Sequence, residues 1–360
     1  MKSKVIKPQT RKSFGTYGMV IIAFAVMQIL ISTGSVSSML QDLLVPLCMY
    51  SILAVSLNLT VGILGELSLG QAGFMCIGAY SSALFSIVTS ETITSAWLRF
   101  PLALFVGGIC AAIFGILIGI PVLRLRGDYL AIVTLAFGEI IKNVFNAMYL
   151  GYDSNGLHFS LKNAEDMHMA ADGKTLINGA LGVNGTPNDS TFLIAFILLL
   201  LTLIIAYNFI NSRTGRAVMA IRDNRIAAES VGINITKYKL ITFALTAFLA
   251  GMAGALYSHN YYTLQASKFD YNMSILILVF VVLGGIGSIR GSVIASVVLV
   301  LLPELLRSIS NYRMLIYSIV LIVMMILTSN ATVKSYIDMY ADKTKQLFKR
   351  TFSRKAKEVE

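Results

Sequence analysis

The sequence has little charge and few of the residues that build metal sites or disulfides. Only 13% of its 360 residues are Asp, Glu, Lys or Arg, and it contains three cysteines and three histidines. A water-soluble protein of this length exposes far more charge, which excludes a soluble fold. The cysteines form no C-x-x-C pair and the histidines are scattered, so we expect neither disulfides nor a metal site.

Motifs of nucleotide hydrolysis and nucleophilic catalysis are also missing. The nearest match to the phosphate-binding G-x-x-x-x-G-K-[ST] pattern, at Gly173-Lys174-Thr175, has His168 in place of the first glycine. The chain contains no G-x-S-x-G turn and no histidine paired with a plausible nucleophile. We therefore expect no enzyme activity and no cofactor in this chain, and any ATP to be used by separate subunits.

Long apolar runs take the place of the missing charge. Hydrophobic residues make up 56% of the chain, and runs such as 17–31, 101–123 and 191–210 approach the ~20 residues that a spanning helix needs. The sequence predicts an all-α polytopic membrane protein with about ten transmembrane helices and glycine-interrupted segments. The predicted spans are 17–33, 39–60, 67–88, 100–123, 129–150, 191–211, 239–259, 273–289, 291–306 and 312–330.

The excess of basic residues has a topological explanation. The formal net charge is +11, and with both termini inside the cell most Lys and Arg residues fall on the cytoplasmic side. We expect basic cytoplasmic tails at 1–16 and 331–360, flanking a membrane domain at 17–330, and no binding of nucleic acid. The first span could instead be a cleaved signal peptide, although its apolar run exceeds the ~7–15 residues of a typical hydrophobic region.

Two glycine-rich segments interrupt the predicted spans. The segment 62–80 reads GILGELSLGQAGFMCIGAY, and a second cluster lies between the eighth and ninth spans. Backbone freed from helical bonds at membrane depth needs protein or a water-filled cavity around it, so both segments are candidates for a path or gate through the membrane. Close helix packing is the alternative. The candidate residues are Glu66, Ser68, Gly70, Gln71, Gly73, Gly284, Gly285 and Gly287.

Two extramembrane segments are long enough to have a function. The external loop 151–190 is rich in Gly, Asn and Asp, which predicts turns and a short lid. The cytoplasmic loop 211–239 contains helix-forming residues over 214–230, with a possible cap at Thr214 and a stop at Gly232. We expect one short amphipathic helix there, outside the bilayer.

The spacing within this predicted helix matches a docking motif. Import permeases contact their ATPases through a loop with the pattern E-A-A-x-x-x-G, and Ala227, Ala228 and Gly232 have that spacing, although Ile226 replaces the Glu. Arg222, Arg225 and Glu229 could form the polar rim of such a contact. A surface helix lying on acidic lipid headgroups is the alternative.

Taken together, these motifs resemble the LivM-type permease of branched-chain amino acid ABC transporters. The resemblance covers most of the membrane domain but not the tails or the loop 158–190, and it is carried by the segments 56–80, 127–142, 154–157, 212–256 and 282–291. It implies a sister permease of the LivH type, two ATPase subunits, an extracytoplasmic substrate-binding protein and a place in the bacterial plasma (inner) membrane. It also implies that Asn155 and Gly156 help the binding protein to dock.

Other kinds of transporter stay open from the residues alone. The solute could be urea, an amide or another amino acid rather than leucine, isoleucine or valine. An ion-coupled secondary transporter would need ionisable residues inside its spans, and these are few. Glu139 and Lys142 are three residues apart on one predicted helix, a spacing that favours a structural ion pair.

Overall fold

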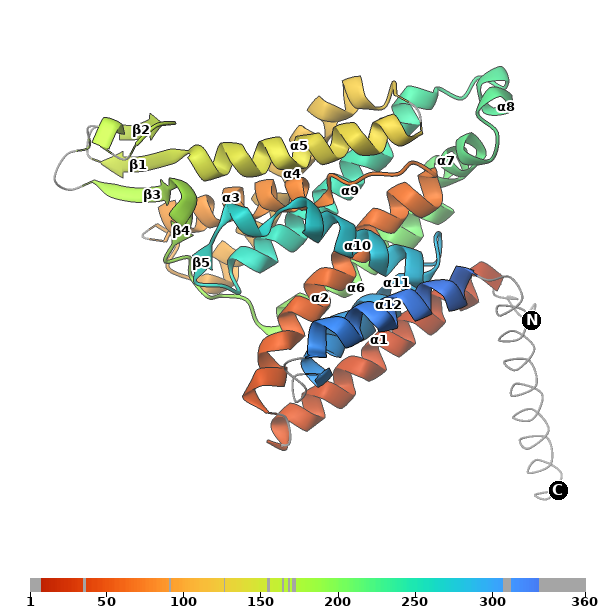
Figure 1. Cartoon of the computed structure of the whole chain (residues 1–360), viewed down its shortest axis with the longest axis horizontal. Coiled ribbons are helices and arrows are strands. Elements are labelled where there is room, and N and C mark those ends of the chain that lie inside the picture. The colour runs from red at the N-terminus through yellow and green to blue at the C-terminus, as the bar shows by residue number, and fades with distance from the viewer. Residues whose placement is uncertain are drawn as a thin grey trace, which may run out of the picture. The chain divides into compact units, whose positions relative to one another are not determined.

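The structure is a computed structural model. It describes residues 8–34, 37–90, 92–125, 127–153, 156–163, 165–167, 169, 173–306 and 312–329. The chain divides into two compact units, Met1–Leu301 and Leu302–Glu360. The first unit holds nearly all of the described structure, and the described part of the second holds the end of one helix and one further helix (Figure 1).

Twelve α-helices are present in the described ranges, and eight helical segments are long and apolar enough to cross a membrane. These eight coincide with the first eight predicted spans, so the polytopic helical fold is confirmed. The ninth and tenth predicted spans coincide with helices of 17 residues each. The helices are α1 Pro8–Ser32, α2 Ser38–Asn58, α3 Gln71–Val88, α4 Ala96–Val122, α5 Asp128–Ala147, α6 Phe192–Asn211, α7 Arg213–Asp223, α8 Arg225–Ser230, α9 Ile235–Ser258, α10 Tyr271–Gly284, α11 Ile289–Leu305 and α12 Arg313–Ser329.

Helix α9 lies at the centre of the first unit and packs against α2, α3 and α4. Small residues permit very close contact: a Cβ atom built on Gly78 of α3 would lie 2.3 Å from the Gly251 Cα atom of α9. A Cβ atom on Gly254 would lie 2.0 Å from the Met75 carbonyl oxygen. Between apolar helices the association depends on such packing rather than on water exclusion, so α3, α4 and α9 form a dense core.

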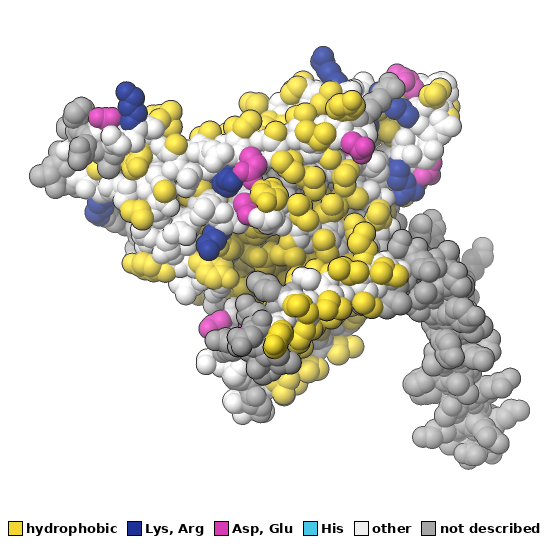
Figure 2. Space-filling view, viewed as in Figure 1, with side chains coloured by type: hydrophobic (Ala, Val, Ile, Leu, Met, Phe, Trp, Pro, Cys, Tyr) yellow, Lys and Arg dark blue, Asp and Glu magenta, His cyan; other side chains and the backbone are white. Residues whose placement is uncertain are grey.

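The surface of the first unit is apolar where hydrocarbon would surround it. Figure 2 shows hydrophobic side chains over most of the face between the β-strands at one end and α7–α8 at the other. Exposed side chains include Phe105 and Leu117 on α4 and Ile132 on α5. This distribution is the one expected for helices facing lipid.

The loop 151–190, predicted to be external and to consist of turns, contains strands. β1 (Tyr149–Asp153) pairs antiparallel with β2 (Gly156–Ser160) and β3 (Lys174–Asn178), and β4 (Val183–Asn184) pairs with β5 (Thr263–Leu264). The prediction of turns was wrong because aromatic and branched residues between the Gly and Asn residues favour short strands. An ion pair of 2.8 Å between Asp189 and Arg99 fastens the loop to α4.

The loop 211–239, predicted to be cytoplasmic, forms two helices, α7 and α8, where the sequence predicted one. Ser212 caps α7 by accepting a hydrogen bond of 3.0 Å from the Gly215 N–H, so the predicted cap at Thr214 was wrong. Asn224 interrupts the helix because its side chain accepts from the Ala227 N–H at 3.0 Å and caps α8 instead. Gly232 has φ +85°, the left-handed conformation that favours glycine after a helix end, as predicted.

A candidate translocation and coupling site

Helix α2 does not run on into α3. It passes into a π-helix at Leu59–Leu64, and the backbone from Gly65 to Gly70 is not helical before α3 begins at Gln71. Gly65 has φ +78°, so a side chain at this position would strain the turn. The glycine-interrupted segment predicted from the sequence is therefore present, and its backbone polar groups need partners from neighbouring helices.

Hydroxyl groups of three other helices supply those partners. The Leu69 N–H donates to Thr134 Oγ1 at 3.0 Å, and the Ala72 N–H donates to Ser274 Oγ at 3.1 Å. The Gln71 side-chain amide donates to Ser56 Oγ at 2.8 Å, and Ser56 Oγ donates to the carbonyl oxygen of Thr246 at 2.7 Å. The segment is thus held by side chains of α2, α5 and α10, and Ser56 is itself bonded to the backbone of α9.

Ser68 is the exception within the break. Its hydroxyl group is buried and has no hydrogen-bond partner among the described residues. A buried hydroxyl without a partner costs free energy, which is tolerated where a ligand or a second conformation supplies a partner. Ser68 therefore remains a candidate path residue, because its buried hydroxyl group is available to bond a ligand.

Gly70 and Gly73 pack against α5. A Cβ atom on Gly70 would lie 2.8 Å from the Thr134 carbonyl oxygen, and one on Gly73 would lie 2.8 Å from the Gly138 Cα atom. These distances are too short for any side chain without movement of the backbone. The two glycines thus bring the start of α3 directly against α5.

The two glycine-rich segments, 62–80 and the one between α10 and α11, are in contact although they are far apart in the sequence. Asn58 Oδ1 accepts a hydrogen bond of 2.8 Å from the Gly287 N–H, and Asn58 Nδ2 donates to Ser292 Oγ at 2.7 Å. A Cβ atom on Gly62 would lie 2.3 Å from the Gly287 nitrogen. The connection between α10 and α11 therefore lies against the π-helix at the end of α2.

Gly284, Gly285 and Gly287 have different roles within that connection. A Cβ atom on Gly284 would lie 2.4 Å from the Gly291 carbonyl carbon, so Gly284 permits α10 and α11 to approach closely. Gly285 and Gly287 have φ +91° and +83°, so they form the turn itself. Close packing, the alternative weighed for this cluster, accounts for Gly284.

Glu66 forms an ion pair with Lys239 at the start of α9. Both side chains are mostly buried, with relative exposures of 16% for Glu66 and 4% for Lys239. Mutual neutralisation lowers the cost of burying both charges. From the sequence, Lys239 was counted among the cytoplasmic basic residues. Its pairing with Glu66 was not predicted, because the two residues are far apart in the chain.

The loop between α6 and α9 contacts the π-helix and the non-helical backbone that follows it, the break at Gly65–Gly70, through Arg222 on α7. Its Nη1 donates a hydrogen bond of 2.9 Å to the Gly62 carbonyl oxygen, and its Nη2 pairs with Asp223 at 2.9 Å. A Cβ atom on Gly65 would lie 2.6 Å from Arg222 Cγ. Among the described hydrogen bonds, Arg222 is therefore the one predicted coupling residue that is bonded to the π-helix next to the break.

The remaining predicted coupling residues lie on or beside α8. Ala228 is buried against Ile221 and Ile235, so it fixes α8 to the rest of the loop. Ala227, Glu229 and Gly232 are exposed and Arg225 is half-buried. Two apolar side chains next to them, Ile226 and Val231, are 82% and 75% exposed. In the sequence analysis Ile226 was noted only because it replaces the Glu of the docking motif.

The two predicted docking residues lie at the β1–β2 turn. Gly156 has φ +128°, and its N–H donates to Asp153 Oδ1 at 3.1 Å. Asn155 lies outside the described residues. On the same hairpin Tyr152, which pairs with Leu157, is exposed, as are Leu157 and Phe159.

A further ion pair lies within the spans. Glu139 pairs with Lys142, as predicted, and its other carboxylate oxygen accepts from the Tyr271 N–H at 2.9 Å. Among the described residues, no group of three or more His, Cys, Asp or Glu side chains could hold a metal ion.

Comparison with known proteins matches residues 39–329 to the family described as branched-chain amino acid transport system / permease component. The chain is 36% identical over 312 residues to the high-affinity branched-chain amino acid transport system permease protein LivM of Salmonella typhimurium, covering 82% of the chain and 69% of that protein. It is 36% identical over 286 residues to LivM of Escherichia coli, covering 77% of the chain and 66% of the relative. The permease protein LivH of Escherichia coli is 26% identical over 262 residues, which are 69% of the chain and 79% of that relative. The match thus spans about two thirds of the two LivM proteins, and no solved structure matches significantly.

Proposed function

The chain belongs to the family of permease components of branched-chain amino acid transport systems, and on this premise we propose that it lines the translocation path of an ATP-driven importer for leucine, isoleucine and valine. It is a multi-pass membrane protein. We place it in the bacterial plasma (inner) membrane with both termini in the cytoplasm. The names of the LivM relatives support the choice of solute.

The observation that carries the proposal is the contact between α7 and the break. A cytoplasmic helix bonded to the π-helix that precedes the non-helical backbone can transmit movement from a partner to the path. The chain has no phosphate-binding loop of its own, so we assign ATP hydrolysis to separate subunits. Closure of those subunits would push α7 and α8, and Arg222 would carry the displacement to Gly62.

We further propose three kinds of partner. A sister permease of the LivH type completes the path, and two ATPase subunits bind α8 through Ile226, Ala227 and Val231. An extracytoplasmic substrate-binding protein docks on the β1–β2 hairpin. Exposed apolar side chains on both surfaces support this assignment, since such groups in extramembrane segments favour contact with another protein.

The arrangement of the charges favours this function over ion-coupled transport. The two ionisable pairs described above, Glu66 with Lys239 and Glu139 with Lys142, are each neutralised within the chain. A proton-coupled carrier needs an acid that gains and loses its charge during the cycle.

Reconstitution tests the proposal. The chain, its sister permease, the two ATPases and the binding protein are combined in proteoliposomes, and ATP-dependent uptake of radiolabelled leucine is measured with each component omitted in turn. We expect uptake to require every component and to be competed by isoleucine and valine. Uptake by this chain alone would refute the proposed dependence on partner ATPases, and preferential uptake of urea or an amide would refute the solute.

A further inference from the structure

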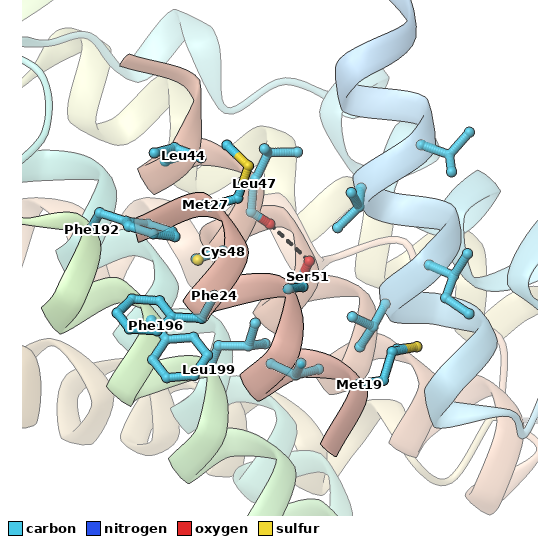
Figure 3. A pocket seen from close by; sticks show the side chains of 16 residues that line it. Met19, Phe24, Met27, Leu44, Leu47, Cys48, Ser51, Phe192, Phe196 and Leu199 are labelled. Carbon is cyan, nitrogen blue, oxygen red and sulfur yellow. Dashed lines mark hydrogen bonds between the residues drawn. The ribbon is translucent and has the colours of Figure 1, made fainter. Parts of the chain in front are cut away.

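An apolar cavity of about 280 Å³ lies inside the first unit, between α1, α2, α6 and α11. Figure 3 shows Met27, Leu47, Phe196 and other apolar side chains around it. The hydroxyl group of Ser51 is already occupied, because it donates to the Leu47 carbonyl oxygen at 2.8 Å and is bonded to Ser296 Oγ at 2.9 Å. The lining offers nothing to a charged amino acid, so the cavity does not belong to the proposed path.

Helix α1 forms one wall of this cavity and is loosely attached. Only 11% of its spanning window is buried, and its described contacts with α6 include the stacking of Phe24 on Phe196 at a centroid distance of 3.9 Å. The outward faces of α1 and α6 are apolar and lie at membrane depth. Hydrocarbon from the bilayer therefore has access to the region, whereas water gains no hydrogen bonds in an apolar cavity.

The volume is sufficient for part of a lipid chain. An apolar protein cavity of ~150 Å³ already binds benzene. A cavity nearly twice that size gains dispersion contacts when a saturated chain fills it. An acyl chain is the apolar molecule that the surrounding membrane supplies in abundance.

A basic group lies at one end of the cavity. Arg290 is on the first turn of α11, directly before the lining residues Val293 and Ile294, and its Nε donates to Thr16 on α1. Its Nη2 atom is buried and has no hydrogen-bond partner among the described residues. A buried guanidinium nitrogen without an acceptor is costly, and an oxygen anion in this position would satisfy it.

We propose that the cavity binds one acyl chain of an anionic phospholipid, with the lipid phosphate bound by Arg290. The bound lipid holds α1 to α6 and α11. This site is independent of the solute that the protein transports. Arg290 and the lining residues Val293 to Val298 lie within about 12 Å of one another along α11, so a lipid bound by its phosphate at Arg290 would have its acyl chain beside the cavity.

Native mass spectrometry of the full-length protein in detergent tests the site. The protein is titrated with dioleoyl-phosphatidylglycerol and, in parallel, with dioleoyl-phosphatidylcholine. We expect tighter retention of the anionic lipid. Arg290→Gln should weaken its binding about five-fold, the effect of one basic residue on an anionic lipid, and leave phosphatidylcholine binding unchanged. Arg290→Lys should keep most of the preference.

Arg216→Gln is the matched control. Arg216 is an exposed arginine of α7 whose guanidinium bonds to the Asn211 carbonyl oxygen at 2.9 Å, away from the cavity. A second variant, Val297→Phe, fills the cavity from α11 and should weaken binding of both lipids, with the thermal unfolding temperature reporting that the fold is intact. Equal retention of the two lipids, equal losses in Arg290→Gln and Arg216→Gln, or undiminished binding in Val297→Phe would each overturn the proposal.

Discussion

The guanidinium group of Arg222 donates a hydrogen bond of 2.9 Å to the backbone carbonyl oxygen of Gly62, which is 160 residues away in the sequence. The acceptor lies in the π-helix that ends α2. One bond therefore joins the loop between α6 and α9 to the π-helix directly before the non-helical backbone, and in the proposed importer force from a partner would enter the membrane domain there.

Arg222→Ala should uncouple ATP hydrolysis from transport. Loss of a hydrogen bond from a charged donor costs about 1.5–3 kcal/mol, so we expect leucine uptake by the reconstituted importer to fall at least ~10-fold. ATP hydrolysis should continue, because α8 still binds the ATPases. Arg216→Ala, on the same helix but without a contact to the break, serves as the control; an equal loss in both variants would contradict the assignment.

Gly62→Ala should destabilise the membrane domain. The added methyl group would lie 2.0 Å from Asn58 Oδ1 and 2.3 Å from the Gly287 nitrogen, and overpacking of this kind costs roughly 1–3 kcal/mol. The thermal unfolding temperature in detergent measures the effect. Gly18→Ala is the matched control, since a Cβ atom on Gly18 meets nothing within 4 Å. Equal temperatures for the two variants would show that the contact is absent.

The pair formed by Glu66 and Lys239 can be separated into its structural and functional parts. Removing one partner of a buried ion pair costs about 3–5 kcal/mol, so Glu66→Gln and Lys239→Met should each lower stability strongly. The double variant should recover much of the loss. If it also restores uptake, the pair is structural; if stability returns without uptake, Glu66 acts in the gate.

Charge on the exposed surface of α8 should prevent assembly. Ile226→Glu places a carboxylate on a side chain that is 82% exposed, so the permease should insert normally but fail to copurify with the ATPases. Ile226→Leu should assemble normally. Ala228→Asp should also abolish uptake, for a different reason: the carboxylate would be buried against Ile221 and Ile235 and would detach α8. Normal transport by either charged variant would refute the docking surface.

The β1–β2 hairpin should be needed for delivery of solute by the binding protein. Leu157 is 70% exposed, and Leu157→Ser should lower the rate of binding-protein-dependent uptake without changing the stability of the permease. His158→Ser on the same strand is a control, because the His158 side chain contacts Asp153 within the hairpin. A normal rate in Leu157→Ser would place docking elsewhere.

Much of the fold follows from local signals in the sequence. Each span is a long apolar run, and the break at Gly65 is encoded by glycines that lie within a few residues of one another. The split of the cytoplasmic helix at Asn224 was missed because an Asn inside a helix-forming stretch is only weakly unfavourable, while its capping role depends on the next turn.

The contacts that assemble the site could not be read from the sequence. Asn58 with Gly287 and Glu66 with Lys239 join residues that are far apart in the chain, and either member alone is an ordinary polar residue or glycine. The outer sheet was missed for a related reason: strands of five residues with glycines between them give a periodic signal too short to distinguish from turns.

The position of the non-helical backbone also limits how the helices can swing. Gly62 and Gly287 are in contact close to the point where Arg222 of α7 bonds to the π-helix, so the two non-helical connections lie at the same level of the membrane domain. The 21 residues of α2 extend roughly 30 Å from that level, and a tilt of about 10° there would sweep its far tip through about 5 Å. In the proposed importer the chain would act as a lever that pivots beside α7, so that a small displacement there would open the opposite side of the membrane domain widely.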